Sequence, residues 1–205
     1  MPLFFKLLVV LAVGCNHAPE EPRADHAPVT ATAASASATS TAQGQAATAA
    51  PPSGKCVVPL ASVAPAVPPA AGARCPPDPQ GRFKLARARV VFPDAGVSVD
   101  AELARNDAEN ERGLMYRQKM GEEEGMFFFL GDRRVQTFWM HNTCIPLDMI
   151  FVDDDGTIVG IVEDASVLDD GPRQVDCASR FVLEVNAGWS RRHHVKPGQH
   201  VVLPS

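Results

Sequence analysis

Aromatic residues are scarce in this chain and absent from a third of it. The 205 residues include 13 aromatic side chains, and none of them lies between residues 16 and 82. That stretch holds 12 of the 18 prolines together with 19 alanines. Such a composition cannot bury enough apolar surface to offset the conformational entropy of an ordered chain. We therefore expect a disordered linker over residues 15–82 and one folded domain over residues 83–205.

An excess of basic residues is also missing. Residues 83–205 carry 14 Lys and Arg against 20 Asp and Glu, a net charge of −6. A domain of this charge without a basic stripe is not expected to bind nucleic acid. The chain has no Gly-rich phosphate loop and no Gly-x-Ser-x-Gly turn. These absences argue against nucleotide binding and against the usual serine hydrolases.

The usual metal-ligand spacings do not occur in the domain. It contains no Cys-x-x-Cys and no His-x-x-x-His, and the adjacent His193 and His194 would point to opposite faces of an extended chain. The run Asp153–Asp155 before Gly156 lacks the alternating ligands of a calcium loop and fits a hairpin turn better. We expect no metal and no cofactor.

The N-terminus indicates export. Residues 1–14 form an apolar run of roughly a dozen residues, too short to span a bilayer, and are typical of a secretory signal. The segment Ala12–Cys15 resembles a bacterial lipoprotein signal, which implies a lipid on Cys15 that attaches the chain to a membrane. The residue after Cys15 is Asn16, whereas an Asp at this position would favour retention in the inner membrane. We therefore expect an anchor in the outer membrane, with the domain facing the periplasm. The alternative is a plain signal peptide with an incidental Cys15.

Four further cysteines suit an oxidising compartment. Cys56, Cys75, Cys144 and Cys177 can pair in three ways. Their positions favour Cys56 with Cys75 in the linker and Cys144 with Cys177 in the domain. The functional alternative is a Cys144 nucleophile with His141 as its base.

The domain shows the pattern of a small β protein. Val97–Leu103 alternates apolar and polar residues, and the turn residues 93–96 connect it to Lys84–Phe92 in a predicted hairpin. Asn106 begins a short helix with Glu109 as its capping-box partner, and Gly113 limits its length. Six further runs resemble strands: Met126–Leu130, Gln136–Asn142, Leu147–Val152, Thr157–Glu163, Phe181–Asn186 and His200–Leu203. We expect a mostly β single domain, a small barrel or jelly roll with one short helix.

Six motifs in this order are similar to those of domain-of-unknown-function family 192, also called uncharacterised protein family 0127. They are Glu111–Tyr116, Gly125–Phe129, Thr137–Thr143, Ile145–Met149, Phe181–Gly188 and Val195–Gly198. The resemblance implies a small, mostly β domain of barrel or jelly-roll type, frequently exported or lipid-anchored and without an established activity. His141 departs from the family, which usually has Lys or Arg there.

Polar residues inside these motifs are the candidates for a ligand-binding site. They stand among large apolar residues, where a polar group must be hydrogen-bonded or destabilise the domain. In one interpretation they satisfy each other and the strand ends, with Asp148 accepting backbone N–H groups or pairing with Arg112. In the other they converge on a shallow pocket with Trp139 as a wall. The candidates are Arg112, Trp139, His141, Asn142, Thr143, Asp148, Glu184 and Asn186.

Two functions follow from these interpretations. The first is a binding or accessory module, tethered in the cell envelope, that recognises a glycan, a peptide or a protein. The alternative is an envelope hydrolase that uses Glu184 and Asp148 with His141 in acid–base catalysis.

Overall fold

The computed structural model describes residues 54–205. The predicted signal peptide, the predicted lipid attachment at Cys15 and the first part of the predicted linker lie outside the described residues. Within residues 54–205, none of the helices has the length and apolar character needed to cross a membrane.

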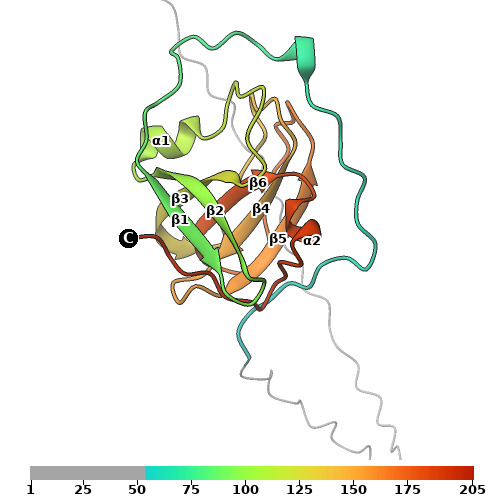
Figure 1. Ribbon diagram of the computed structural model, residues 1–205, viewed down its shortest axis with the longest axis vertical. Coiled ribbons are helices and arrows are strands. Elements are labelled where there is room, and N and C mark those ends of the chain that lie inside the picture. Colours follow the sequence, from blue (N-terminus) through green and yellow to red (C-terminus); the bar gives the residue numbers. More distant parts are fainter. Residues whose placement is uncertain (1–53) are drawn as a thin grey trace, which may run out of the picture. The chain divides into compact units, whose positions relative to one another are not determined.

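Six strands form one mixed sheet, in the order β1-β2-β3-β6-β4-β5 (Figure 1). Neighbouring strands are antiparallel except β2 and β3, which are parallel because the chain returns through α1 (Asp107–Arg112) between them. The expectation of a mostly β domain is confirmed. The strands are β1 (Arg87–Phe92), β2 (Val97–Ala104), β3 (Glu124–Arg134), β4 (Leu147–Val152), β5 (Ile158–Ala165) and β6 (Ser179–Asn186).

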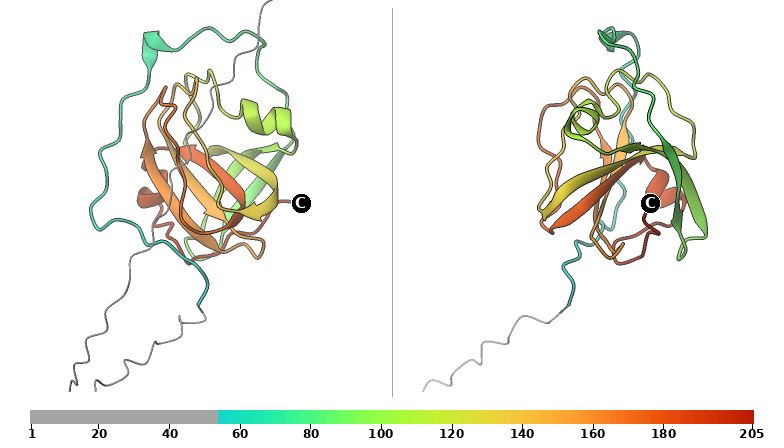
Figure 2. Two further views of the ribbon diagram at one scale, coloured as in Figure 1. Left: turned by 180° about the vertical axis from the view of Figure 1, so that it is seen from behind. Right: turned by 90° about the vertical axis from the view of Figure 1, so that its left-hand side faces the viewer.

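The sheet is curved but open, with β1 and β5 at its edges (Figure 2). The C-terminal segment contacts β1 through the Val202 N–H, which donates to the Val91 carbonyl at 2.9 Å, and it contacts the start of β5 through single hydrogen bonds. These isolated bridges replace the predicted strand His200–Leu203 and do not close a barrel within residues 54–205. The parallel β2–β3 pair also differs from a jelly roll, which is built of antiparallel strands.

The segment Gln136–Asn142 is a loop, so the prediction of a strand there is wrong. Its single bridge pairs Phe138 with Arg173. Asn142 has a left-handed backbone (φ 52°), and the Thr143 N–H donates to the Met140 carbonyl at 3.0 Å, so the chain turns there instead of staying extended. We call residues 136–143 the site loop.

The helix predicted at Asn106 is confirmed. Asn106 caps α1 by accepting from the Glu109 N–H at 3.1 Å, while the Glu109 carboxylate accepts from the Arg105 N–H at 2.7 Å. Gly113 ends the helix with φ 45°. A second short helix, α2 (Trp189–Arg192), was not predicted, because four residues are too few to show helical periodicity.

Each face of the sheet carries its own apolar cluster, because side chains alternate along every strand. One cluster includes Phe127 and Leu183 and packs against Trp189 of α2. The other includes Phe128 and Val182 and lies beneath α1 and the site loop. Alternate residues of a strand therefore face opposite sides of the sheet, and this decides which side each functional side chain lies on.

Two disulfides join the last part of the predicted linker to the domain. Cys56 is bonded to Cys177 and Cys75 to Cys144, so the predicted pairing is wrong. Residues 54–82, which we call the strap, run around the outside of the domain (Figures 1 and 2) and are bonded to it covalently at these two cysteines. The disulfide at Cys144 also argues against the alternative in which Cys144 is a thiol nucleophile with His141 as its base.

The strap has few backbone hydrogen bonds to the domain and contains one three-residue 3-10 helix (Gly72–Arg74). The Val58 N–H donates to the Val159 carbonyl at 2.8 Å, and the Ala71 N–H donates to the Cys144 carbonyl at 2.9 Å. Both contacts lie close to a disulfide. Side chains add to these contacts: Asp78 of the strap forms a salt bridge with Arg112, Lys55 with Asp155 and Arg82 with Glu102, while Val58 and Leu60 pack against the two apolar clusters.

Replacing Cys56 and Cys177 together by serine should lower the free energy of unfolding by only about 1 kcal/mol. Because Cys75–Cys144 stays closed, the shortest path between Cys56 and Cys177 in the unfolded chain is roughly 50 residues, and the chain-entropy model assigns such a loop roughly 4 kcal/mol. The folded domain without the bond would regain the freedom of the roughly 20-residue loop back to Cys75, which offsets about 3 kcal/mol. Urea unfolding of the double variant, with exposed Val63→Ser as control, measures the difference. A loss of 4 kcal/mol or more would show that the strap also stabilises the domain by packing.

Candidate functional site

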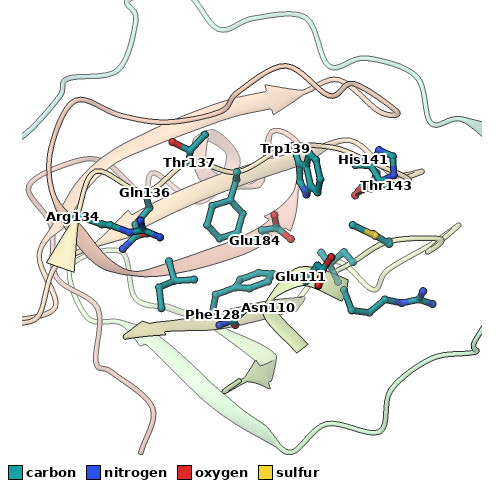
Figure 3. Close-up of a pocket in the computed structure, with 16 residues that line it drawn as sticks. Asn110, Glu111, Phe128, Arg134, Gln136, Thr137, Trp139, His141, Thr143 and Glu184 are labelled. Carbon is teal, nitrogen blue, oxygen red and sulfur yellow. Dashed lines mark hydrogen bonds between the residues drawn. The ribbon is translucent and has the colours of Figure 1, made fainter. Parts of the chain in front are cut away.

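A pocket of about 230 Å³ opens on the second face of the sheet, between α1 and the site loop (Figure 3). Its floor is β6 and one wall is the end of β3. Arg134 and Gln136 lie at one end of the pocket and His141 and Thr143 at the other, with Glu184 between them (Figure 3). The lining residues are Asn110, Glu111, Arg112, Gly113, Leu114, Met115, Phe128, Leu130, Arg134, Gln136, Thr137, Phe138, Trp139, His141, Thr143 and Glu184.

Glu184 is the buried carboxyl group of this pocket. It lies in β6 opposite Met126 of β3 and Met149 of β4, and only 4% of it is exposed. Within residues 54–205 its carboxyl group has no hydrogen-bond partner, and its oxygens keep accessible surface in the pocket. Burial raises the pKa of Glu184 to about 8, against a smaller opposing effect of the Arg117 charge. Glu184 is therefore mostly protonated at neutral pH.

Aromatic side chains form the walls around Glu184. Phe128 and Phe138 meet edge to face, with ring centroids 5.1 Å apart. Trp139 stands at the mouth with 48% of its surface exposed and stacks on His141 at 5.0 Å. The predicted role of Trp139 as a wall agrees with this position.

Asn110 adds a second unpaired polar group to the lining. Its side-chain N–H₂ donates to the Phe129 carbonyl at 3.0 Å, which orients the amide. The buried Oδ1 atom has no hydrogen-bond partner within the described part of the chain. This oxygen is enclosed by protein atoms and does not open into the pocket.

Two of the basic side chains at the pocket already have partners. Arg112 forms a salt bridge of 2.5 Å with Asp78 of the strap, which lowers the pKa of that carboxyl. The Arg112 guanidinium also lies 4.5 Å from the centroid of the Tyr116 ring. His141 Nδ1 lies 2.7 Å from a carboxylate oxygen of Asp170. These two candidates border the pocket but have partners of their own.

Asn142 and Thr143 hold the site loop in place. The Asn142 side-chain amide donates to the Tyr116 hydroxyl at 2.8 Å, and the Asn142 backbone carbonyl accepts from the Tyr116 N–H at 2.7 Å. The buried Thr143 hydroxyl donates to the His141 carbonyl at 3.3 Å. Thr143 lines the pocket, whereas Asn142 lines an adjoining open cavity of about 450 Å³ that shares Trp139 with it.

Asp148 and Asn186 do not line the pocket. Asp148 is fully buried and accepts three backbone N–H groups, from Asp164, Gly188 and Ser190, at 2.9–3.0 Å. Of the two structural alternatives for Asp148, the structure contains the bonds to backbone N–H groups, and Arg112 pairs with Asp78 instead. The Asn186 amide donates to the Gly121 carbonyl at 2.8 Å and fixes the turn before β3.

Sequence reasoning missed the apolar walls and the α1 side of the pocket. Phe128 and Phe138 are as apolar as the residues of the core, and no local feature of the sequence distinguishes them from core residues. Asn110 did carry a signal, since it is a polar residue in the turn of α1 that precedes the apolar Leu114. That signal did not indicate which strand the helix covers.

Residues 54–205 contain no cluster of three or more His, Cys, Asp or Glu side chains arranged to hold a metal ion. The pocket combines the Glu184 carboxyl and aromatic walls with the basic side chains Arg112, Arg134 and His141 in its lining. It can bind a small group through hydrogen bonding, charge and apolar contact, and a protonated carboxyl can also transfer a proton.

Together, the open mixed sheet and the aromatic pocket over a buried carboxyl define a small, mostly β domain with one candidate ligand site. Residues 90–203 match the family DUF192, described as "Uncharacterized ACR". The chain belongs to this family. No curated protein matches the chain.

Two crystal structures resemble the domain. One is a "putative transcription regulator" from Sinorhizobium meliloti 1021, 36% identical, covering 60% of this chain and 97% of its own, with a TM-score of 0.56. The other is a protein of unknown function from Novosphingobium aromaticivorans DSM 12444, 38% identical, covering 69% of this chain and 94% of its own, also with a TM-score of 0.56. This chain therefore aligns with almost the whole length of both relatives.

Proposed function

We propose that this protein is a binding or accessory module, tethered in the cell envelope, that takes a small molecule or a protruding group of a glycan, peptide or protein into the pocket above Glu184. The observation that carries the proposal is the mostly buried Glu184 carboxyl, which opens into the pocket and has no hydrogen-bond partner among residues 54–205. Burying such a group costs stability unless something pairs with it. A bound ligand would supply that pairing.

The proposed location rests on the N-terminal sequence and the disulfides. Residues 1–15 have the pattern of a lipoprotein signal, and Asn16 favours delivery to the outer membrane. Two disulfides are typical of a protein outside the cytoplasm. A lipid on Cys15 would make the membrane a partner of the chain and present the domain to the periplasm.

Nucleic acid is not proposed as a partner. The name of the Sinorhizobium relative refers to transcription, but residues 83–205 of this chain carry a net charge of −6. Binding to the phosphate backbone requires clustered Lys and Arg.

Replacing Trp139 by alanine should weaken binding to envelope fractions at least tenfold and leave the fold intact. Trp139 offers a large, half-exposed ring at the mouth of the pocket, where aromatic residues often dominate binding energy. Sedimentation of the purified chain with envelope fractions measures the binding. Val202→Ala, an exposed apolar residue away from the pocket, is the matched control. Equal binding by both variants would contradict a role for this pocket.

A hydrolase is the second candidate, favoured by the pKa of Glu184. A carboxyl held protonated at neutral pH can act as a general acid, and His141 lines the same pocket. Asp148 does not fit its expected role as the second carboxylate, since its three backbone N–H partners lie away from the pocket. Catalysis predicts turnover of envelope glycans or peptides that Glu184→Gln abolishes, whereas the binding module predicts no turnover by either form.

A further inference from the structure

We propose that the partner bound at this pocket is an extended polypeptide segment, which pairs its backbone with the site loop and places one side chain above Glu184. This inference rests on the proposed binding function and names the class of partner. It starts from the site loop, which has the composition of a strand but forms only one bridge within residues 54–205, between Phe138 and Arg173.

One edge of the site loop is already paired. Phe138 and Arg173 exchange two backbone hydrogen bonds of 2.8 Å, and the Met140 N–H donates to the Asp169 carbonyl at 2.9 Å. In an extended chain the backbone groups of successive residues point to opposite edges, and those of every second residue point to the same edge. The residues before Phe138 and before Met140 therefore present their N–H and carbonyl groups to the other edge.

That other edge is unpaired and borders the pocket. The N–H and carbonyl groups of Thr137 and Trp139 form no hydrogen bond with any residue among 54–205. Both residues line the pocket, and Figure 3 shows them on one side of it, with Asn110 and Glu111 of α1 on the other. Donors and acceptors thus stand two residues apart along the side of an open pocket. This spacing matches a second polypeptide strand, which offers its own donors and acceptors at the same period.

The sequence of the loop does not protect this edge. Exposed strand edges usually carry Lys, Pro, an inward-pointing charge or a bulge that prevents pairing with a second chain. Residues 136–140 are Gln-Thr-Phe-Trp-Met and contain neither a charged residue nor a proline. Thr, Phe and Trp are enriched in strands. The loop therefore keeps the properties of a strand that lacks one neighbour.

The pocket has the size for one side chain of such a segment. Its volume of about 230 Å³ lies below the range of roughly 300–1,000 Å³ that holds a drug-sized ligand. Phe138 and Met140 pack in the apolar cluster beneath the loop, whereas Trp139 is half exposed. A partner residue opposite Phe138 would point to the same side as Phe138. Its side chain would then enter the pocket, where Glu184 lies at the floor.

The groove also continues beyond the pocket, as an extended partner requires. The adjoining open cavity of about 450 Å³ shares Trp139 and His141 with the pocket and is bordered on its far side by Gln80 of the strap. A strand paired with the site loop would run past Trp139 into this cavity. A single small molecule would leave it empty.

A short peptide, acetyl-Val-Thr-Tyr-Thr-Val-amide, tests the proposal on the purified full chain. Two isomers separate backbone pairing from side-chain contact: one carries N-methyl groups on its second and fourth residues, the other on its third and fifth. N-methylation removes an N–H donor and blocks that edge, and only one of the two sets can face the site loop. We expect one isomer to bind about as tightly as the parent peptide and the other at least tenfold more weakly.

Hydrogen exchange and a backbone variant locate the contact on the chain. The parent peptide should slow exchange at the Thr137 and Trp139 amides at least tenfold, and should change the amides of Phe138 and Met140 less, because these are paired already. Thr137→Pro removes one N–H of the free edge and should weaken binding of the peptide at least tenfold more than Thr137→Ala. Both variants lose the bond of the Thr137 hydroxyl to Gln174, so alanine is the matched control.

Equal affinities of the two N-methylated isomers, or unchanged exchange at the Thr137 and Trp139 amides, would overturn strand pairing and leave the binding pocket in place. Failure of the parent peptide to bind would overturn it as well. The binding function fails separately, if Trp139→Ala has no effect on binding to envelope fractions.

Discussion

Replacing Glu184 by glutamine is expected to stabilise the domain at neutral pH, by roughly 3 kcal/mol at pH 7. The folded pKa of Glu184 is raised to about 8 from an ordinary value of 4.5. At neutral pH the unfolded chain has therefore released a proton that the folded chain retains. Glutamine fits the same space and does not have to take up a proton on folding.

The effect should depend on pH in a defined window. Because the folded state binds more protons than the unfolded state between pH 4.5 and pH 8, wild-type stability falls as pH rises through that range and levels off above it. The fall is at most about 1.4 kcal/mol per pH unit, and about 4 to 5 kcal/mol in all. The glutamine variant should lack this contribution and match the wild type near pH 4.

Urea unfolding at several pH values measures both curves. The exposed Glu123→Gln is the control and should change stability by less than about 0.5 kcal/mol. A glutamine variant less stable than wild type by 2 kcal/mol or more would mean that the carboxyl is a structural anchor. Both functions proposed for the pocket would then lose their main support. If glutamine instead stabilises the domain, the wild type sacrifices stability to keep a carboxyl at this position, which is typical of functional sites.

Much of the sheet could be predicted from the sequence because its signals are local. The alternation in Val97–Leu103 and the turn at residues 93–96 define the β1–β2 hairpin, which the structure contains. Asn106 and Glu109 likewise define the start of α1. In each case the decisive contacts lie within about ten residues of one another.

The errors arose where distant segments decide the outcome. Cys56 and Cys75 are neighbours in sequence, but the strap passes around the domain and brings each to a different partner. Gln136–Asn142 has the composition of a strand, yet the turn at Asn142 and its bonds to Tyr116 keep it as a loop. Neither result can be read from local pattern.

The candidate site was predicted in part for the same reason. Trp139 and Glu184 were found because each stands out within its own motif, and both line the pocket. Asn110 and Phe128 join them only because α1 packs over β3. Asp148 was grouped with Glu184 as a second carboxylate, but Asp148 is opposite Val185 across β4 and β6, so the two carboxyls point to opposite faces of the sheet.

Replacing Asp148 by alanine should therefore have the opposite effect to the change at Glu184, a loss of roughly 3 to 5 kcal/mol. Its Oδ1 atom accepts the N–H groups of Asp164 and Gly188, each at 3.0 Å, and its Oδ2 atom accepts that of Ser190 at 2.9 Å. These bonds tie the end of β5 and the start of α2 to β4. Alanine leaves three donors unpaired in a region that excludes water, and each has to be desolvated without compensation.

The variant Asp148→Asn separates the charge of Asp148 from its shape, and Asp132→Ala is the control. Asp148→Asn keeps an oxygen for two of the donors but turns an N–H₂ toward the Ser190 N–H, so we expect it to lose about half as much, roughly 2 kcal/mol. Asp132→Ala, an exposed aspartate in β3, should stay within about 0.5 kcal/mol of wild type. Urea unfolding gives the totals, and hydrogen exchange at the Gly188 and Ser190 amides should accelerate in the alanine variant before the rest of the sheet opens. Unchanged exchange at these two amides would show that the start of α2 does not depend on Asp148, since the same three bonds predict both the local and the global loss.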